Sequence, residues 1–158
     1  MSGELLLPNK YKPIGWFLLI PSTIMGIILS LTGFDKFQIK TKVLAIFNEE
    51  LFEKIKFASI IEANLTNTIV GIVFIVGAMF VGFSKEKKED EFIAKLRLSS
   101  LLWAVWVNYG LLTIATLFVY GTAYFNVMVY NMFTVLIIFI VRFSYILHKN
   151  NKIDLDEK

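Results

Sequence analysis

Four polar residues within the most apolar part of the chain are its strongest candidates for chemistry. Arg142, Asn131 and Thr134 fall on one face of a predicted helix over residues 124–147, and Asn108 lies in the preceding apolar segment. A charged side chain within a membrane is costly unless it is paired or reaches the lipid headgroups. Two interpretations follow: Arg142 snorkels to the headgroups, or it points inward towards these polar groups and holds an anionic ligand or a partner's carboxylate.

The two asparagines of this polar face, Asn108 and Asn131, also allow two interpretations. They can form a hydrogen bond between neighbouring helices, which is worth roughly 1 kcal/mol in a membrane. Alternatively, they can line a path for a polar ligand or an ion. The first interpretation makes the pair a packing feature, and the second makes it part of a functional site.

The chain lacks the residues on which most catalytic and metal sites depend. It contains no cysteine, which excludes disulfides, thiol catalysis and metal–thiolate sites. Its single histidine, His148, lies at a predicted span boundary, and no Asp, Glu, Lys or His lies within a predicted span. Ser and Thr have no adjacent base, and the glycines are not spaced for phosphate binding. We therefore expect no catalytic residue, no cofactor and no metal, and predict that the protein is not an enzyme.

The elements that must position these residues are membrane-spanning helices. Hydrophobic residues make up 56% of the chain, and the mean hydropathy is +0.65. The uncharged run from Leu98 to Val141 is about twice the length that one helix needs to cross a hydrocarbon core of about 30 Å, so it must cross, turn and cross back. With the uncharged runs 13–34 and 63–84, the chain has four predicted spans, at approximately 14–33, 65–83, 99–121 and 124–147.

These spans predict an all-α integral membrane protein with a single transmembrane domain over residues 1–158. The simplest arrangement is an antiparallel bundle of four transmembrane helices. Basic residues favour the cytoplasmic side of a membrane. They gather before the first span, in the inner loop at about 84–98 and after the fourth span, so both termini are expected to be cytoplasmic. The strong preference for Lys over Arg suggests a bacterial genome, and hence the bacterial cytoplasmic (inner) membrane.

The outer loop, at approximately 34–64, carries a pattern of helical spacing. Between Val43 and Glu62 the apolar residues recur at intervals of three and four: Leu44, Phe47, Leu51, Ile55 and Ala58. Glu50 and Lys54 form an i,i+4 pair that favours a helix. We predict an amphipathic helix that lies on the bilayer or extends the second span. The alternative is a docking or sensing surface outside the membrane.

The inner loop at about 84–98 mixes charges of both signs before the third span begins. The simpler interpretation is a solvated helix end whose long side chains snorkel. The alternative is a contact point for a cytosolic partner or for anionic lipid headgroups.

Small and aromatic residues mark the faces by which these helices are expected to pack. Membrane helices associate by close packing, so small residues gather on the inward face of each helix. The first two spans carry such stripes, with the packing residues Gly15, Ser22, Gly26, Ser30, Gly71, Ala78 and Gly82. The third span has a second, aromatic face that the bundle does not need, formed by Trp106, Tyr109, Thr113 and Thr116. This face predicts contact with a partner, such as a second copy, another membrane protein or a lipid.

Two classes of function fit these features. The first is a small non-enzymatic inner-membrane protein that acts as a subunit, sensor, or signalling or accessory component through helix–helix contacts, as a homo-oligomer or with another membrane protein. The alternative is a homo-oligomeric pore or small-solute channel or transporter, in which Asn131, Thr134 and Arg142 line the path. The net charge of +3 is small and lies in loops, so no nucleic-acid partner is expected.

Overall fold

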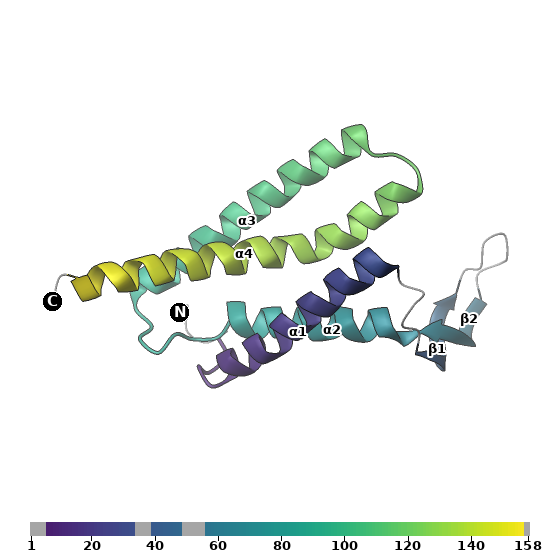
Figure 1. Cartoon of the computed structure of the whole chain (residues 1–158), viewed down its shortest axis with the longest axis horizontal. Coiled ribbons are helices and arrows are strands. Elements are labelled where there is room, and N and C mark those ends of the chain that lie inside the picture. Colours follow the sequence, from purple (N-terminus) through teal and green to yellow (C-terminus); the bar gives the residue numbers. More distant parts are fainter. Residues whose placement is uncertain (1–5, 34–38, 49–55, 157–158) are drawn as a thin grey trace. The chain divides into compact units, whose positions relative to one another are not determined.

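The computed structural model describes residues 6–33, 39–48 and 56–156, and most of them are helical (Figure 1). The elements, in chain order, are α1 (Tyr11–Thr32), β1 (Lys40–Asn48), β2 (Lys56–Asn64), α2 (Leu65–Gly82), α3 (Glu91–Phe118) and α4 (Thr122–Asp156). Within the described residues, all four helices are long and apolar enough to cross a membrane, and they lie where the four spans are predicted. The helices α3 and α4 extend beyond the apolar run into the flanking charged segments, because charged residues continue a helix in water as well as apolar ones do.

The described chain divides into two compact units, which are treated separately. The first comprises residues 1–18 and 75–158, and the second comprises residues 19–74. In the first unit, α3 and α4 pack side by side as an antiparallel hairpin (Figure 1). Contacts at three successive levels define the pairing: Arg97 with Phe143, Asn108 with Asn131, and Thr116 with Tyr124. The turn between the helices contains Gly121 at φ 71°, a backbone conformation that glycine adopts without strain.

The same unit contains the beginning of α1 and the end of α2, which lie in close contact. The Tyr11 and Phe80 rings meet edge to face, with centroids 5.4 Å apart. Gly82 at the end of α2 lies against the ring of Phe139 in α4, which is fully buried. The buried apolar side chains of this unit include Ala78, Val81, Ile93, Ala104, Phe139, Ile140 and Phe143. They form the core at the end of the unit where the α2–α3 loop lies.

Backbone hydrogen bonds join the segment before α1 to the α2–α3 loop. The Leu7 amide donates to the Phe83 carbonyl, and the Lys85 amide donates to the Leu7 carbonyl, each at 2.9 Å. The Asn9 side-chain amide donates to the Lys85 carbonyl at 2.7 Å. These bonds place Lys10, directly before α1, and Lys12, in its first turn, beside the lysines of the loop at one end of the unit.

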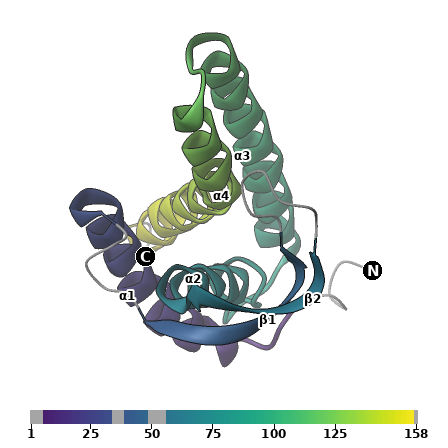
Figure 2. The same cartoon turned by 90° about the vertical axis from the view of Figure 1, so that its right-hand side faces the viewer.

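The second unit contains a β-hairpin where the sequence predicted an amphipathic helix, so that prediction is wrong. The strands β1 and β2 pair in antiparallel register, with Val43 opposite Ile61 and Lys42 opposite Glu62 (Figure 2). Leu44 and Phe47 lie in β1 and Ala58 lies in β2, whereas Leu51, Ile55 and the pair Glu50–Lys54 lie outside the described residues. The fold is therefore mostly helical rather than all-α.

A physical cause for the hairpin lies in its composition and its anchoring. Both strands are rich in β-branched and aromatic residues, and the opposite charges of Lys42 and Glu62 face each other across the pair. The base of the hairpin is fastened to the first turn of α2: the Leu65 amide donates to the Ile39 carbonyl, and the Ile39 amide donates to Thr66 Oγ1, each at 3.0 Å. A short surface helix has no such support and is marginal in water.

Candidate functional site

The structure brings together two of the four residues of the predicted polar face. The Asn108 and Asn131 side chains exchange two hydrogen bonds, with donor–acceptor distances of 3.3 and 3.1 Å between amide nitrogen and oxygen. Asn108 is buried, and Asn131 is half-buried. Each amide thus satisfies part of the other's hydrogen-bonding capacity in the middle of the α3–α4 hairpin. This arrangement matches the first of the two interpretations of the pair, a hydrogen bond between neighbouring helices.

Arg142 lies apart from that amide pair, whereas Thr134 lies about one helical turn from Asn131. The Arg142 guanidinium stacks on the Trp103 ring, with 4.6 Å between Cζ and the ring centroid. Eleven residues separate Arg142 from Asn131, a rise of about 16 Å along a helix. The Thr134 hydroxyl donates to the Tyr130 carbonyl of its own helix at 2.8 Å. Arg142 is therefore a separate polar site from the rest of the predicted face.

Arg142 keeps one unsatisfied group beside this aromatic contact. Its Nη1 atom is buried and has no hydrogen-bond partner among the described residues. Stacking on an indole ring satisfies a guanidinium through its flat face and leaves the N–H groups in its plane without partners. Arg142 therefore retains donors that point at neither amide of the Asn108–Asn131 pair.

The predicted packing residues differ in how closely other atoms approach them. A Cβ atom at Gly15 would lie 2.7 Å from the Phe80 Cβ and 2.8 Å from the Val81 backbone nitrogen. At Gly82 it would lie 2.6 Å from the Phe139 ring, and Ala78 is fully buried. In the second unit, Ser22 is buried, Gly26 and Gly71 are half-buried, and Ser30 is exposed. Close packing is therefore concentrated at Gly15, Ala78 and Gly82.

The predicted partner face of α3 is exposed along its whole length. Trp106 is 80% exposed and Tyr109 is 61% exposed. The Thr113 and Thr116 hydroxyls donate to the Tyr109 and Leu112 carbonyls of the same helix, each at 2.8 Å. Gly110 lies among these residues, and a Cβ atom there would meet no atom within 4 Å. We call Trp106, Tyr109, Gly110, Thr113 and Thr116 the aromatic face.

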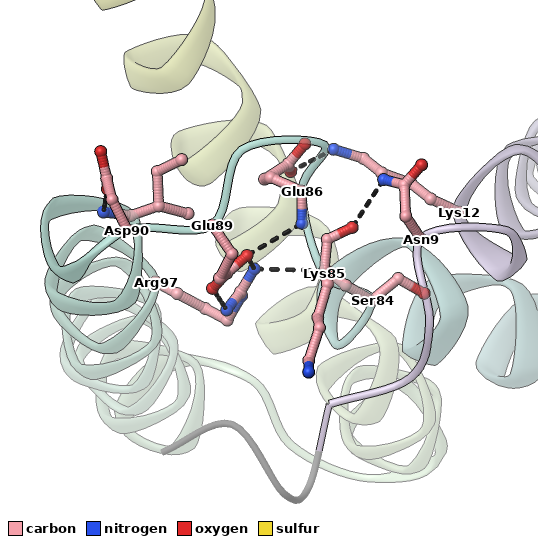
Figure 3. A network of polar contacts seen from close by, with 9 residues as sticks. Asn9, Lys12, Ser84, Lys85, Glu86, Glu89, Asp90 and Arg97 are labelled. Carbon is pink, nitrogen blue, oxygen red and sulfur yellow. Dashed lines mark hydrogen bonds and ion pairs between the residues drawn. The ribbon is translucent and has the colours of Figure 1, made fainter. Parts of the chain in front are cut away.

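A polar network around Arg97 is the feature that the sequence did not predict (Figure 3). Arg97 is 7% exposed and binds Glu89 through two nitrogens, with Nη1 at 2.6 Å from Oε1 and Nη2 at 3.2 Å from Oε2. Nη2 also donates to the Ser84 carbonyl at 3.2 Å. The guanidinium lies over the Phe143 ring, 5.2 Å from its centroid. Arg97 thereby connects the α2–α3 loop, α3 and α4.

The acid of this network is held in its charged form. Partial burial raises the pKa of Glu89, but hydrogen bonds from Arg97 and the Glu86 amide, with the charges of Arg97 and Lys85, lower that pKa below its usual value. The Glu86 amide donates to Glu89 Oε2 at 2.8 Å. A carboxylate that accepts several donors prefers the ionised state. A charge-assisted bond thus joins the α2–α3 loop to α3.

One signal in the sequence could have identified this network. The chain has 14 Lys and only two Arg, and both arginines stack on aromatic rings of the hairpin. Guanidinium differs from ammonium because it stacks on rings and binds carboxylates through two nitrogens. Arg97 was counted with the lysines of the loop as an orienting charge, so its structural role was missed.

Comparisons of the chain with protein-family models, curated proteins and solved structures found no match. No group of three or more His, Asp or Glu side chains is placed to hold a metal ion within the part of the chain that the structure describes.

Proposed function

We propose that this is a non-enzymatic membrane protein that acts as a subunit or signalling component through helix–helix contacts, and that the aromatic face of α3 binds the same face of a second copy. The observation that carries the proposal is a set of exposed hydrogen-bond donors at the middle depth of a membrane-spanning helix. Trp106 and Tyr109 lie near the centre of the uncharged part of α3, which begins at Leu98 and ends with the helix at Phe118.

These two donors lie where a lipid bilayer offers no acceptor. Neither the Trp106 indole N–H nor the Tyr109 hydroxyl has a hydrogen-bond partner among the described residues, and both side chains are mostly exposed. Trp and Tyr prefer the two membrane interfaces, where their polar edges reach water. At middle depth an unpaired polar group is unfavourable, so a second protein surface is needed to satisfy it.

The aromatic face is complementary to itself, which favours a second copy as the partner. The Thr113 hydroxyl proton is used within α3, so its oxygen remains available as an acceptor, whereas the Thr116 oxygen already contacts the Tyr124 hydroxyl of α4. The face therefore carries both donors and acceptors. Gly110 lies between them and allows a second helix to approach closely, as small residues do at membrane helix interfaces. Two copies inserted in the same direction would pair in parallel and cross near Gly110.

The orientation and location of the protein form part of the same proposal. Lys10 and Lys12 lie beside the lysine-rich α2–α3 loop, because Leu7 and Asn9 bind that loop. A concentration of basic residues at one end of a membrane protein favours the cytoplasmic side. We infer that this end, with both termini, faces the cytoplasm from a bacterial inner membrane.

The test is the number of copies per particle, measured by single-molecule photobleaching after reconstitution of the labelled full chain into large bilayer vesicles. We expect two bleaching steps for the original chain and one for Gly110→Ile, which places a branched side chain at the crossing point. Ile114→Val, a conservative change at another exposed position of α3, is the matched control and should keep two steps. One step for the original chain, or two for Gly110→Ile, would contradict the proposal.

A second candidate function, a homo-oligomeric pore, is favoured by Arg142. This arginine lies within the apolar part of α4 and has a buried, unpaired Nη1 atom, and intramembrane charges often mark ion paths. Replacement of Arg142 by Gln should then change the anion permeability of vesicles that contain the protein. Identical permeability for the original chain, Arg142→Gln and empty vesicles would exclude this function.

A further inference from the structure

A cleft at the lysine-rich end of the first unit has the chemistry of an amphiphile-binding site. Its volume is about 750 Å³, and residues from the beginning of α1, the α2–α3 loop, the beginning of α3 and the last turns of α4 line it. All of these residues belong to one unit. We propose that this cleft binds an anionic phospholipid, with the phosphate at Lys87 and Lys88. The proposal is independent of the aromatic face.

The polar side of the cleft has free positive charge. It contains three lysines and two acids. Lys12 forms an ion pair with Glu86, and the Asp90 carboxylate accepts from the Ile93 amide at 2.8 Å as the N-cap of α3. Lys87 and Lys88 are exposed and pair with no acid among the described residues. Asp90 keeps its charge as the N-cap, so the three lysines and two acids leave the cleft a net charge of +1, with the Lys87 and Lys88 ammonium groups available to an anion.

The cleft also has apolar lining residues, which belong to the membrane-spanning helices. Trp16 comes from α1, Phe92 from the first turn of α3 and Leu147 from α4. Tryptophan prefers the boundary between headgroups and acyl chains. A free phosphate would contact only the lysines, and an acidic peptide would leave the apolar wall without a partner. A phospholipid matches both sides, because it joins a phosphate to hydrocarbon.

The position of the cleft along the helices fits the level of lipid headgroups. It lies at the end of α3 that carries Glu91, Lys95 and Arg97, directly before the uncharged run begins at Leu98. Figure 3 shows that Lys12 and Glu86 of the cleft lie beside the Arg97–Glu89 network. That network fixes the loop that carries Lys87 and Lys88, so the lysines are held at the mouth of the cleft rather than on a free segment.

The test is native mass spectrometry of the full-length chain in detergent, titrated with phosphatidylglycerol or phosphatidylcholine of identical acyl chains. We expect the original chain to bind phosphatidylglycerol about tenfold more tightly, because Lys87 and Lys88 attract its anionic headgroup and phosphatidylcholine has no net charge. Lys87→Gln/Lys88→Gln should remove this preference. Lys40→Gln/Lys42→Gln, which neutralises two exposed lysines of β1, is the matched control and should retain it.

Three results would overturn the proposal. The first is equal affinity of the original chain for the two lipids. The second is an equal loss of preference in both double variants, which would reduce the effect to overall charge. The third is displacement of bound phosphatidylglycerol by glycerol 3-phosphate or by a short polyglutamate peptide, which would assign the cleft to free phosphate or to an acidic protein segment. Circular dichroism of each variant, which should match that of the original chain, checks that the helices are intact.

Discussion

Two regions of α3 differ in whether their polar side chains have partners within the chain. At the beginning of the helix, Arg97 is buried and binds Glu89, the Ser84 carbonyl and the Phe143 ring. About two to three turns later, Trp106 and Tyr109 are exposed, and their donors have no partner among the described residues. The first region uses the Nη1 and Nη2 atoms of Arg97 to hold one chain together, although Arg97 Nε and Ser100 Oγ are buried without a partner among the described residues. The second leaves its donors available, which is expected of a surface that meets another protein.

Two glycines, Gly15 of α1 and Gly110 of α3, differ in a similar way. Gly15 is required within the chain, because Phe80 and the backbone of Val81 leave no room for a side chain. At Gly110, by contrast, an added Cβ atom would meet no atom within 4 Å. A glycine in the middle of a helix nevertheless destabilises it by about 1 kcal/mol relative to alanine. An open glycine at such a cost is most easily explained by a helix from another copy.

The largest expected effect concerns the Arg97–Glu89 network at the beginning of α3. Arg97→Ala removes the ion pair and leaves Glu89 without its strongest partner, so we expect a loss of about 3 kcal/mol in the free energy of unfolding. Lys95→Ala is the control, because Lys95 pairs with Glu91 on the exposed surface of the same helix. It should cost less than about 0.5 kcal/mol. Reversible unfolding in mixed micelles, monitored by circular dichroism, measures both values, and equal losses would contradict the comparison.

The two glycines give the next largest effect and should respond with opposite signs. Gly15→Ala should destabilise the chain by about 2 kcal/mol, because the contacting atoms include the backbone of α2. Gly110→Ala should stabilise the single chain by roughly 0.5–1 kcal/mol through helix propensity. The same unfolding measurement, made at a dilution at which particles hold one copy, distinguishes them. Destabilisation by Gly110→Ala under these conditions would show that Gly110 has a role within the chain.

A smaller effect is expected for the Asn108–Asn131 pair in the middle of the α3–α4 hairpin. In a double-mutant cycle with Asn108→Ala and Asn131→Ala, we expect a coupling of about 1 kcal/mol, because hydrogen bonds between membrane helices are modest. A cycle of Asn108→Ala with Thr134→Ala is the control and should show no coupling. A coupling near zero for the first cycle would mean that the two amides do not interact.

The smallest expected effect is a dependence of the unfolding free energy on pH, caused by Glu89 of the Arg97 network. The pKa of Glu89 is lower in the folded chain than the ordinary value of 4.5. The stability that Glu89 contributes is therefore present above about pH 4.5 and is lost as the pH falls through the lowered pKa. The decrease in the unfolding free energy between pH 6 and pH 3 should be smaller for Glu89→Gln than for the original chain. Identical decreases would contradict the Arg97–Glu89 bond.

Much of the fold could be predicted from the sequence because membrane spans depend on composition. Long uncharged runs leave few alternatives, and the four helices lie where those runs predict them. The β-hairpin was missed because apolar spacing at intervals of three and four fits a helix, while pairing between Val43 and Ile61 depends on residues far apart in the sequence. Local periodicity cannot report such a pairing.

The polar sites could be predicted only in part, for a similar reason. Asn108 and Asn131 were recognisable as partners because polar amides within apolar runs need each other. The Arg97 network depends on a loop that folds Glu89 back towards α3, and the cleft depends on the binding of Leu7 and Asn9 to that loop. Neither loop geometry is encoded in a simple spacing, although the presence of an arginine in a lysine-rich chain was an available signal.

The most direct test of the central claim, that α3 binds a second copy through its aromatic face, uses the absence of cysteine from the chain. Single cysteines at Gly110→Cys and Thr113→Cys would be oxidised in native membranes, with Met132→Cys as a control on the exposed surface of α4 at similar depth. We predict disulfide-linked dimers at positions 110 and 113 and none at 132. No dimer at position 110, or equal cross-linking at all three positions, would contradict the account.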